Sequence, residues 1–230
     1  MKDREADAME GKRIRAVIFD MDGVIFDSER LLLESWQVVA ARHGFDGIEE
    51  TLQKCFGVNV TASRHFYFER YGDDFPLDEY KAEAAELFWA RCAGTGHPPV
   101  KPGARELLAF LRDRNVPLAL ASSTRSEVVR TELERAGLLD FFRVVIGGDQ
   151  IPRSKPEPDI FLAAAAALGE DPADCAVIED SFNGVRAARA AGTRPLMVPD
   201  MVPPDGEMAE KAEVILPDLD AARVYLAERL

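Results

Sequence analysis

The stretch AVIFDMDGVIFD, residues Ala16 to Asp27, decides the fold, because an apolar run ends on Asp20 and Asp22 with Gly23 behind them. A strand that stops in this way presents acid groups at its carboxyl end, where ligands bind in open parallel sheets. Two acids one residue apart repel each other unless a cation or a shared proton relieves them, and Mg²⁺ prefers such oxygen ligands. A solvated aspartate pair in a strand-to-helix turn is the alternative, and this stretch alone leaves it open.

Short apolar runs alternate with helical stretches through most of the chain. The expected strands are Ala16 to Phe19, Val116 to Ala121, Val144 to Ile146, Ala176 to Ile178, Pro195 to Val198 and Val214 to Leu216. The expected helices are Arg105 to Arg114, Ser126 to Ala136, Asp159 to Leu168 and Asn183 to Ala191, and a glycine suited to a left-handed C-cap follows three of them. Most of the strands are continuously apolar, as in sheets covered on both faces. The alternation predicts an α/β fold with a doubly wound parallel sheet.

Residues 29–97 break this alternation, because they show helical periodicity with no convincing strand between. We therefore expect a helical insert at 29–97 in a Rossmann-like core made of 14–28 and 98–230. Residues 1–13 are too charged for a signal peptide and are expected to form a flexible, solvated tail.

Composition narrows the class of protein and its partners. With 47% apolar residues, the 230-residue chain can bury a core, and its net charge of −13 argues against nucleic acid or an anionic membrane as a partner. No apolar run approaches the ~18 residues of a membrane span. Cys55, Cys92 and Cys175 form no C-x-x-C pair, which favours reduced thiols and a cytoplasmic location.

Four motifs in one order carry a family resemblance: FDMDGVIFDS, LASST ending on Ser122 to Thr124, SKPEPDIF around Lys155, and VIEDSFNG around Glu179 and Asp180. Together they resemble the haloacid dehalogenase superfamily, in the branch with a small helical cap, and within it the beta-phosphoglucomutase-like phosphatases. The resemblance spans residues 16 to about 198. It implies that the helical insert is a cap that closes over the active site, excludes water and selects the substrate.

The resemblance assigns roles to the first motif. Asp20 matches the nucleophile that forms an aspartyl phosphate, and it also binds Mg²⁺. Asp22 matches the general acid/base, with its backbone carbonyl completing the metal site. Because dehalogenases of the superfamily lack the second aspartate, Asp22 points to phosphoryl chemistry.

The other three motifs supply the remaining groups that phosphoryl transfer needs. Ser122 matches a hydroxyl donor to the phosphoryl group, with the backbone amides of Ser123 and Thr124 beside it in an anion-binding turn. Lys155 matches the cation that bridges the nucleophile and a phosphate oxygen. Asp180 matches a metal ligand, and Glu179 is expected to bind a metal-bound water or the Lys155 ammonium.

Substrate identity rests on the insert, where the chain departs from the mutase pattern. The positions of the mutase histidine and arginine correspond to Leu32 and Val60, and Arg64 and His65 are nearby substitutes only if the loop folds differently. We therefore expect an Mg²⁺-dependent phosphatase acting on a small phosphate monoester, such as a sugar phosphate, with a sugar phosphomutase as the alternative. A binding protein without turnover is a third hypothesis, disfavoured because every catalytic position is present. A small phosphorylated metabolite is the expected partner, and the chain is expected to be a monomer or a homodimer.

Overall fold

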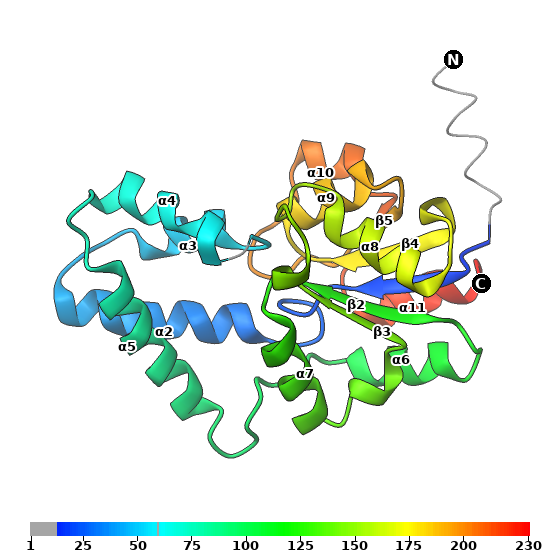
Figure 1. The fold of residues 1–230 in the computed structure, drawn as a ribbon, viewed down its shortest axis with the longest axis horizontal. Coiled ribbons are helices and arrows are strands. Elements are labelled where there is room, and N and C mark those ends of the chain that lie inside the picture. Colours follow the sequence, from blue (N-terminus) through cyan, green and yellow to red (C-terminus); the bar gives the residue numbers. More distant parts are fainter. Residues whose placement is uncertain (1–12, 59) are drawn as a thin grey trace.

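A parallel sheet forms the centre of the core, which confirms the predicted α/β class. The computed structural model describes residues 13–58 and 60–230, and in this part of the chain six strands pair in the order β3-β2-β1-β4-β5-β6, all in parallel (Figure 1). The strands are β1 (Ala16–Phe19), β2 (Leu118–Ser122), β3 (Val144–Gly147), β4 (Cys175–Glu179), β5 (Arg194–Met197) and β6 (Val214–Ile215).

Helices cover both faces of this sheet, because successive residues of a strand point to opposite sides. The helices of the core are α6 (Ala104–Arg112), α7 (Ser126–Arg135), α8 (Asp159–Leu168), α9 (Phe182–Ala190), α10 (Gly206–Lys211) and α11 (Leu219–Ala227). Val17 and Phe19 of β1 lie in the cluster that includes residues of α6, α7 and α11, whereas Ala16 and Ile18 lie in the cluster that includes residues of α8 and α9. Figure 1 shows these two layers above and below the sheet. Short 3₁₀ helices occupy Leu139–Phe141, Gly148–Gln150 and Pro172–Asp174.

The predicted elements differ from the structure mainly at their ends. Strand β2 starts at Leu118 rather than Val116, because Asn115 adopts a left-handed conformation with φ 57° and the amide of Val116 donates to the carbonyl of Leu111. Helices α10 (Gly206–Lys211) and α11 (Leu219–Ala227) were not among the expected elements. Both begin at an aspartate N-cap, where Asp205 accepts from the amide of Met208 and Asp218 from that of Ala221.

In the described residues between β1 and α6, four helices stand beside the sheet (Figure 1). They are α2 (Ser28–His43), α3 (Ile48–Cys55), α4 (Val60–Tyr71) and α5 (Leu77–Arg91). They share a hydrophobic cluster of their own, which contains Trp36, Leu52 and Tyr67 and is separate from the clusters of the sheet. Met201 and Val202, from the loop after β5, pack against this cluster. We call these four helices the cap.

The two segments that connect the cap to the core lie side by side. Phe26 and Val100 form an antiparallel bridge, the amide of Asp27 donates to the carbonyl of Pro99 (2.9 Å), and the amide of Lys101 donates to the carbonyl of Ile25 (2.9 Å). Both ends of the cap are therefore held at one place on the core.

Two further expectations concern the ends and the environment of the chain. The expected tail, 1–13, lies outside the described residues except for Arg13, whose guanidinium donates to the carbonyl of Leu230. Within residues 13–58 and 60–230, no helix combines the length and the apolar character that crossing a membrane requires.

Candidate active site

Acid groups from two neighbouring strands meet at the carboxyl edge of the sheet. Asp20 follows β1 and Asp180 follows β4, and because these strands pair in parallel, the amide of Asp20 donates to the carbonyl of Ile178 (3.0 Å). Carboxylate oxygens of Asp20, Glu179 and Asp180 lie within 4.8 Å of one another, and all three residues are buried. The sheet register thus gathers the first and the last of the predicted motifs.

Lys155 lies between two of these acids. Its ammonium donates to Asp20 Oδ1 and to Glu179 Oε1, both at 2.6 Å, and lies 4.9 Å from the centre of the Phe161 ring. The residue is only 2% exposed. Burial alone would lower the pKa of Lys155, but the carboxylates of Asp20 and Glu179 raise it above its ordinary value. The lysine therefore stays charged in this site.

Burial has the opposite effect on the aspartate that Lys155 contacts. It raises the pKa of Asp20 to about 7, and Glu179 and Asp22 add to this rise, although Lys155 opposes it. A further positive charge that binds beside Asp20 favours loss of the proton from its carboxyl group.

The two acids that end β4 differ in how well their oxygens are satisfied. Glu179 Oε1 accepts from Lys155, and Oε2 accepts from the amide (2.9 Å) and the hydroxyl (3.0 Å) of Ser181. Asp180 Oδ1, in contrast, is buried and has no hydrogen-bond partner among the described residues. Of the two expected roles of Glu179, the contact with the Lys155 ammonium is present in the structure.

Asp22 faces hydroxyl groups. Its Oδ1 accepts from Ser28 Oγ (2.6 Å), and its Oδ2 accepts from Thr124 Oγ1 (3.1 Å) and, at 3.5 Å, from Ser122 Oγ. Among the described residues, the acid cluster of Asp20, Glu179 and Asp180 does not include the Asp22 side chain. Sequence reasoning missed Thr124 Oγ1 as a partner of Asp22, because only its backbone amide was expected to act, and that amide donates to Ser122 Oγ (3.1 Å).

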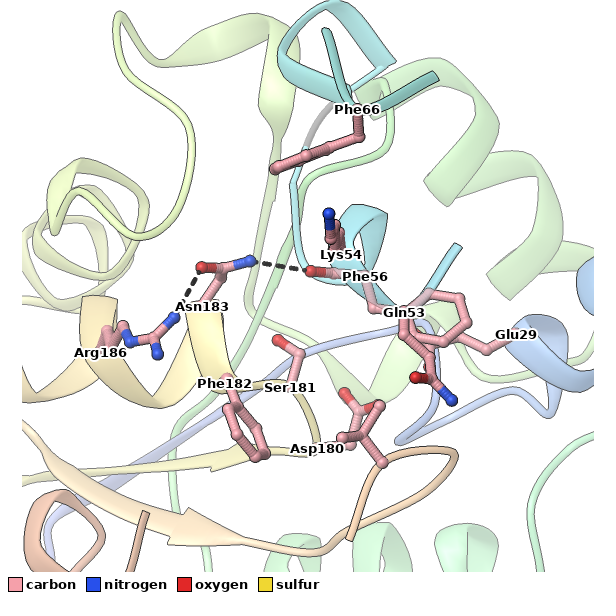
Figure 2. A pocket seen from close by; sticks show the side chains of 11 residues that line it. Glu29, Gln53, Lys54, Phe56, Phe66, Asp180, Ser181, Phe182, Asn183 and Arg186 are labelled. Atoms are coloured by element: carbon pink, nitrogen blue, oxygen red, sulfur yellow. Dashed lines mark hydrogen bonds between the residues drawn. The ribbon is translucent and has the colours of Figure 1, made fainter. Parts of the chain in front are cut away.

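Two hydrogen bonds fasten a cap loop to the core beside the site. The Ser123 hydroxyl donates to the carbonyl of Gly57 (2.9 Å), and Asn183 Nδ2 donates to the carbonyl of Phe56 (3.2 Å; Figure 2). Gly57 has a φ of 75°, and a Cβ at this position would overlap the Ser181 hydroxyl. Ser123, predicted to bind substrate, thus uses its hydroxyl to hold the cap loop.

A pocket lies between the cap and the core at this point. Its volume is about 270 Å³, and Figure 2 shows Lys54 and Phe66 of the cap on the opposite side from Asp180 and Ser181 of the core. The remaining lining residues are Glu29, Gln53, Phe56, Phe182, Asn183, Arg186 and Val202. The guanidinium of Arg186 already pairs with Glu207 at 2.6 and 2.8 Å. One end of the pocket therefore reaches the acid cluster and the other is formed by cap side chains.

Glu29 belongs to this site and was not predicted from the sequence. It stands in the first turn of α2, where acidic residues are common for reasons of helix stability alone, so the sequence carried no signal. Burial, followed by the charge of Asp22, raises the pKa of Glu29 well above its ordinary value.

A divalent cation fits the residues at the sheet edge. The donor set of Asp20 and Asp180 consists of carboxylate oxygens, which a hard cation such as Mg²⁺ prefers over nitrogen or sulfur. The buried Asp180 Oδ1, which no described group satisfies, is the oxygen that a cation would complete.

Comparison with known proteins adds a family match over most of the chain. A model of the haloacid dehalogenase-like hydrolases matches residues 14–192. The chain is 34% identical over 190 residues to a bifunctional riboflavin kinase/FMN phosphatase of Arabidopsis thaliana, which covers 80% of this chain but only 48% of that protein, so the chain spans about half of its length.

Two further relatives match along most of their length. A phosphorylated carbohydrates phosphatase of Thermotoga maritima is 34% identical over 179 residues, covering 78% of this chain and 82% of that protein. The crystal structure of a HAD family hydrolase from Deinococcus radiodurans R1, with bound phosphate and sodium, is 30% identical. It has a TM-score of 0.74 and covers 94% of this chain and 96% of that chain.

Proposed function

The chain belongs to the haloacid dehalogenase-like hydrolase family, and on this premise we propose that it is an Mg²⁺-dependent phosphatase that hydrolyses a sugar phosphate or similar small monoester. The reaction would pass through an aspartyl phosphate on Asp20. The observation that carries the proposal is Lys155, fixed between Asp20 and Glu179 beside the unsatisfied oxygen of Asp180. These are the groups that phosphoryl transfer requires.

In the first half of the reaction, a carboxylate oxygen of Asp20 attacks phosphorus. The bond from phosphorus to the sugar oxygen breaks as the new bond forms, and the carboxyl group of Asp22 donates a proton to the departing oxygen. In the second half, Asp22 takes a proton from water, the water oxygen attacks phosphorus, and the Asp20 carboxylate leaves. The products are the free alcohol and inorganic phosphate.

The other residues position these two aspartates and balance charge. Lys155 orients Asp20 through Oδ1 and supplies a fixed positive charge to the transferring phosphoryl oxygens. Ser28 and Thr124 hold the two oxygens of Asp22. Asp20, Asp180 and the Asp22 backbone carbonyl would hold the Mg²⁺, which when bound neutralises charge on the phosphate.

The size and lining of the pocket between cap and core favour a small substrate. The pocket of about 270 Å³ has room for one sugar-sized group, and its lining mixes phenylalanine rings with the polar ends of Gln53 and Asn183. The name of the Thermotoga relative, a phosphorylated carbohydrates phosphatase, agrees with this choice. A small phosphorylated metabolite is therefore the proposed partner. A cytoplasmic location agrees with the free thiols of all three cysteines.

A phosphomutase has less support from the described residues. Leu32, at the position of the mutase histidine, packs against the hydrophobic cluster of the cap, and Arg64 is held by Asp78 at 2.5 Å. The side chain of Val60, at the position of the mutase arginine, lies outside the described residues.

The test measures phosphate release from a panel of sugar phosphates, with Mg²⁺ and with a chelator. We expect Mg²⁺-dependent release that is lost in Asp20→Asn and retained in Asp27→Asn, a matched change seven residues away. Acid quenching during turnover of a ³²P-labelled substrate should trap a hydroxylamine-sensitive phosphoprotein in the wild type but not in Asp20→Asn. Silence across the panel, with isomerisation after addition of a sugar bisphosphate, would replace the phosphatase with the mutase.

A further inference from the structure

A second group of three acids lies beside the catalytic cluster. Carboxylate oxygens of Glu29, Asp180 and Asp200 lie within 4.8 Å of one another. The three residues come from the first turn of α2, the end of β4 and the loop after β5. The proposed reaction assigns no task to Glu29 or Asp200, and Asp180 belongs to both clusters.

Each member of this group has an oxygen that protein donors leave unsatisfied. Glu29 Oε2, Asp180 Oδ1 and Asp200 Oδ2 are all buried and lack a hydrogen-bond partner within the described part of the chain. The other oxygen of Asp200 accepts from the ammonium of Lys101 (2.5 Å). Glu29 is only 6% exposed, so solvent does not replace the missing partner. Buried carboxylates in folded proteins are hydrogen-bonded, paired or bound to a cation.

The charges around both clusters do not balance. Among the described residues, six carboxylates and two ammonium groups lie in or next to the two clusters, an excess of four negative charges when all are ionised; these groups are Asp20, Asp22, Glu29, Glu179, Asp180, Asp200, Lys101 and Lys155. One divalent cation offsets half of this excess, and a second divalent cation offsets the other half before substrate binds. A bound phosphate monoester then adds negative charge again.

We propose that Glu29, Asp180 and Asp200 bind a second divalent cation, Mg²⁺ or Mn²⁺, and that Asp180 is shared between this site and the catalytic one. A carboxylate that joins two cations is usual in two-metal phosphatases. Glu29 and Asp180 also line the pocket, so the second cation has a route from solvent and stands beside the bound substrate. This inference goes beyond the proposed phosphatase reaction, which requires one cation.

The test counts bound Mn²⁺ without using turnover. The free ion is measured by electron paramagnetic resonance during titration of the full chain at physiological ionic strength. We expect the wild type to bind one more tight ion than Glu29→Gln and one more than Asp200→Asn. Glu34→Gln is the matched control, because Glu34 is a partly exposed glutamate on the same helix and lies outside both clusters, and it should bind as many ions as the wild type.

The loss of one ion, rather than the total, decides the outcome, because an acidic surface also binds Mn²⁺ weakly. If Glu29→Gln and Asp200→Asn bind as many ions as the wild type, shared protons satisfy the three acids and the proposal is wrong. Circular dichroism checks that each variant is folded. If Glu29→Gln does not fold, Asp200→Asn alone decides the outcome, because the Asp200 side chain is partly exposed. Two ions without phosphate release would overturn the proposed activity alone, whereas release with one ion would overturn this inference alone.

Discussion

Replacing Lys155 with methionine should destabilise the protein, because it leaves the buried acids of the active site without their counterion. The ammonium donates to Asp20 and Glu179 at 2.6 Å, and the side chains of these three residues are 1%, 7% and 0% exposed. Loss of one partner from a buried ion pair typically destabilises a protein by about 3–5 kcal/mol, because the remaining charge has neither water nor a counterion. We expect a loss of that size in the free energy of unfolding at pH 8.

The difference in unfolding free energy between the wild type and Lys155→Met should increase with pH. The pKa of Asp20 is about 7 in the folded wild type, so below that value the folded wild type and the variant both hold a proton on Asp20. Above pH 7, Asp20 of the folded wild type releases its proton. In the variant, which lacks the ammonium group, Asp20 either keeps its proton or carries an unpaired negative charge. The difference in unfolding free energy should therefore grow above pH 7, by up to about 1.4 kcal/mol per pH unit.

The assay is urea denaturation of both chains in chelator, from pH 6 to pH 9. The double variant Lys155→Met with Glu179→Gln is the internal check, because removing one of the two uncompensated acids should restore part of the lost stability. A cost below about 1 kcal/mol, as for an exposed ion pair, or a cost independent of pH would refute the reasoning.

Three further predictions follow from individual residues. Asp22→Asn should lower kcat by about 10²- to 10⁴-fold without changing the thermal midpoint, and an unchanged kcat would exclude it as the acid/base. Gly184→Ala should lower the unfolding free energy by about 1–3 kcal/mol, because its Cβ would overlap the Glu179 carboxylate. Gly206→Ala, whose Cβ meets no described atom within 4 Å, is its control in urea denaturation. Burial, with a smaller contribution from Asp22, raises the pKa of Glu132 to about 8. In the unfolded chain, the carboxyl group of Glu132 loses its proton at a lower pH than in the folded chain. The free energy of unfolding, measured by urea denaturation in chelator, should therefore fall from pH 5 to pH 8, and it should fall less in Glu132→Gln.

The sequence predicted which acidic residues lie at the carboxyl ends of strands. Asp20 and Asp180 each come directly after a run of apolar residues, and parallel pairing of two such runs is enough to bring them together. The alternation of apolar and helical segments likewise predicted the parallel sheet, because burial on both faces leaves a continuous apolar pattern.

The sequence did not reveal contacts that depend on how the cap docks. The Ser123 hydroxyl meets the carbonyl of Gly57, and no local pattern links two residues so far apart in the chain. Glu29 and Asp200 reach the acid cluster only because α2 and the loop after β5 pack beside it. Such contacts are set by tertiary packing, which one sequence does not specify.

The paired connection between cap and core bears on how such an enzyme can diversify. Because Phe26 and Val100 lie opposite each other, the cap is attached like a long loop whose two ends coincide. A segment of different length or sequence, inherited by recombination, can occupy the same attachment without altering the register of any strand in the sheet. Selection can thus exchange the part that recognises the molecule while the catalytic acids keep their places.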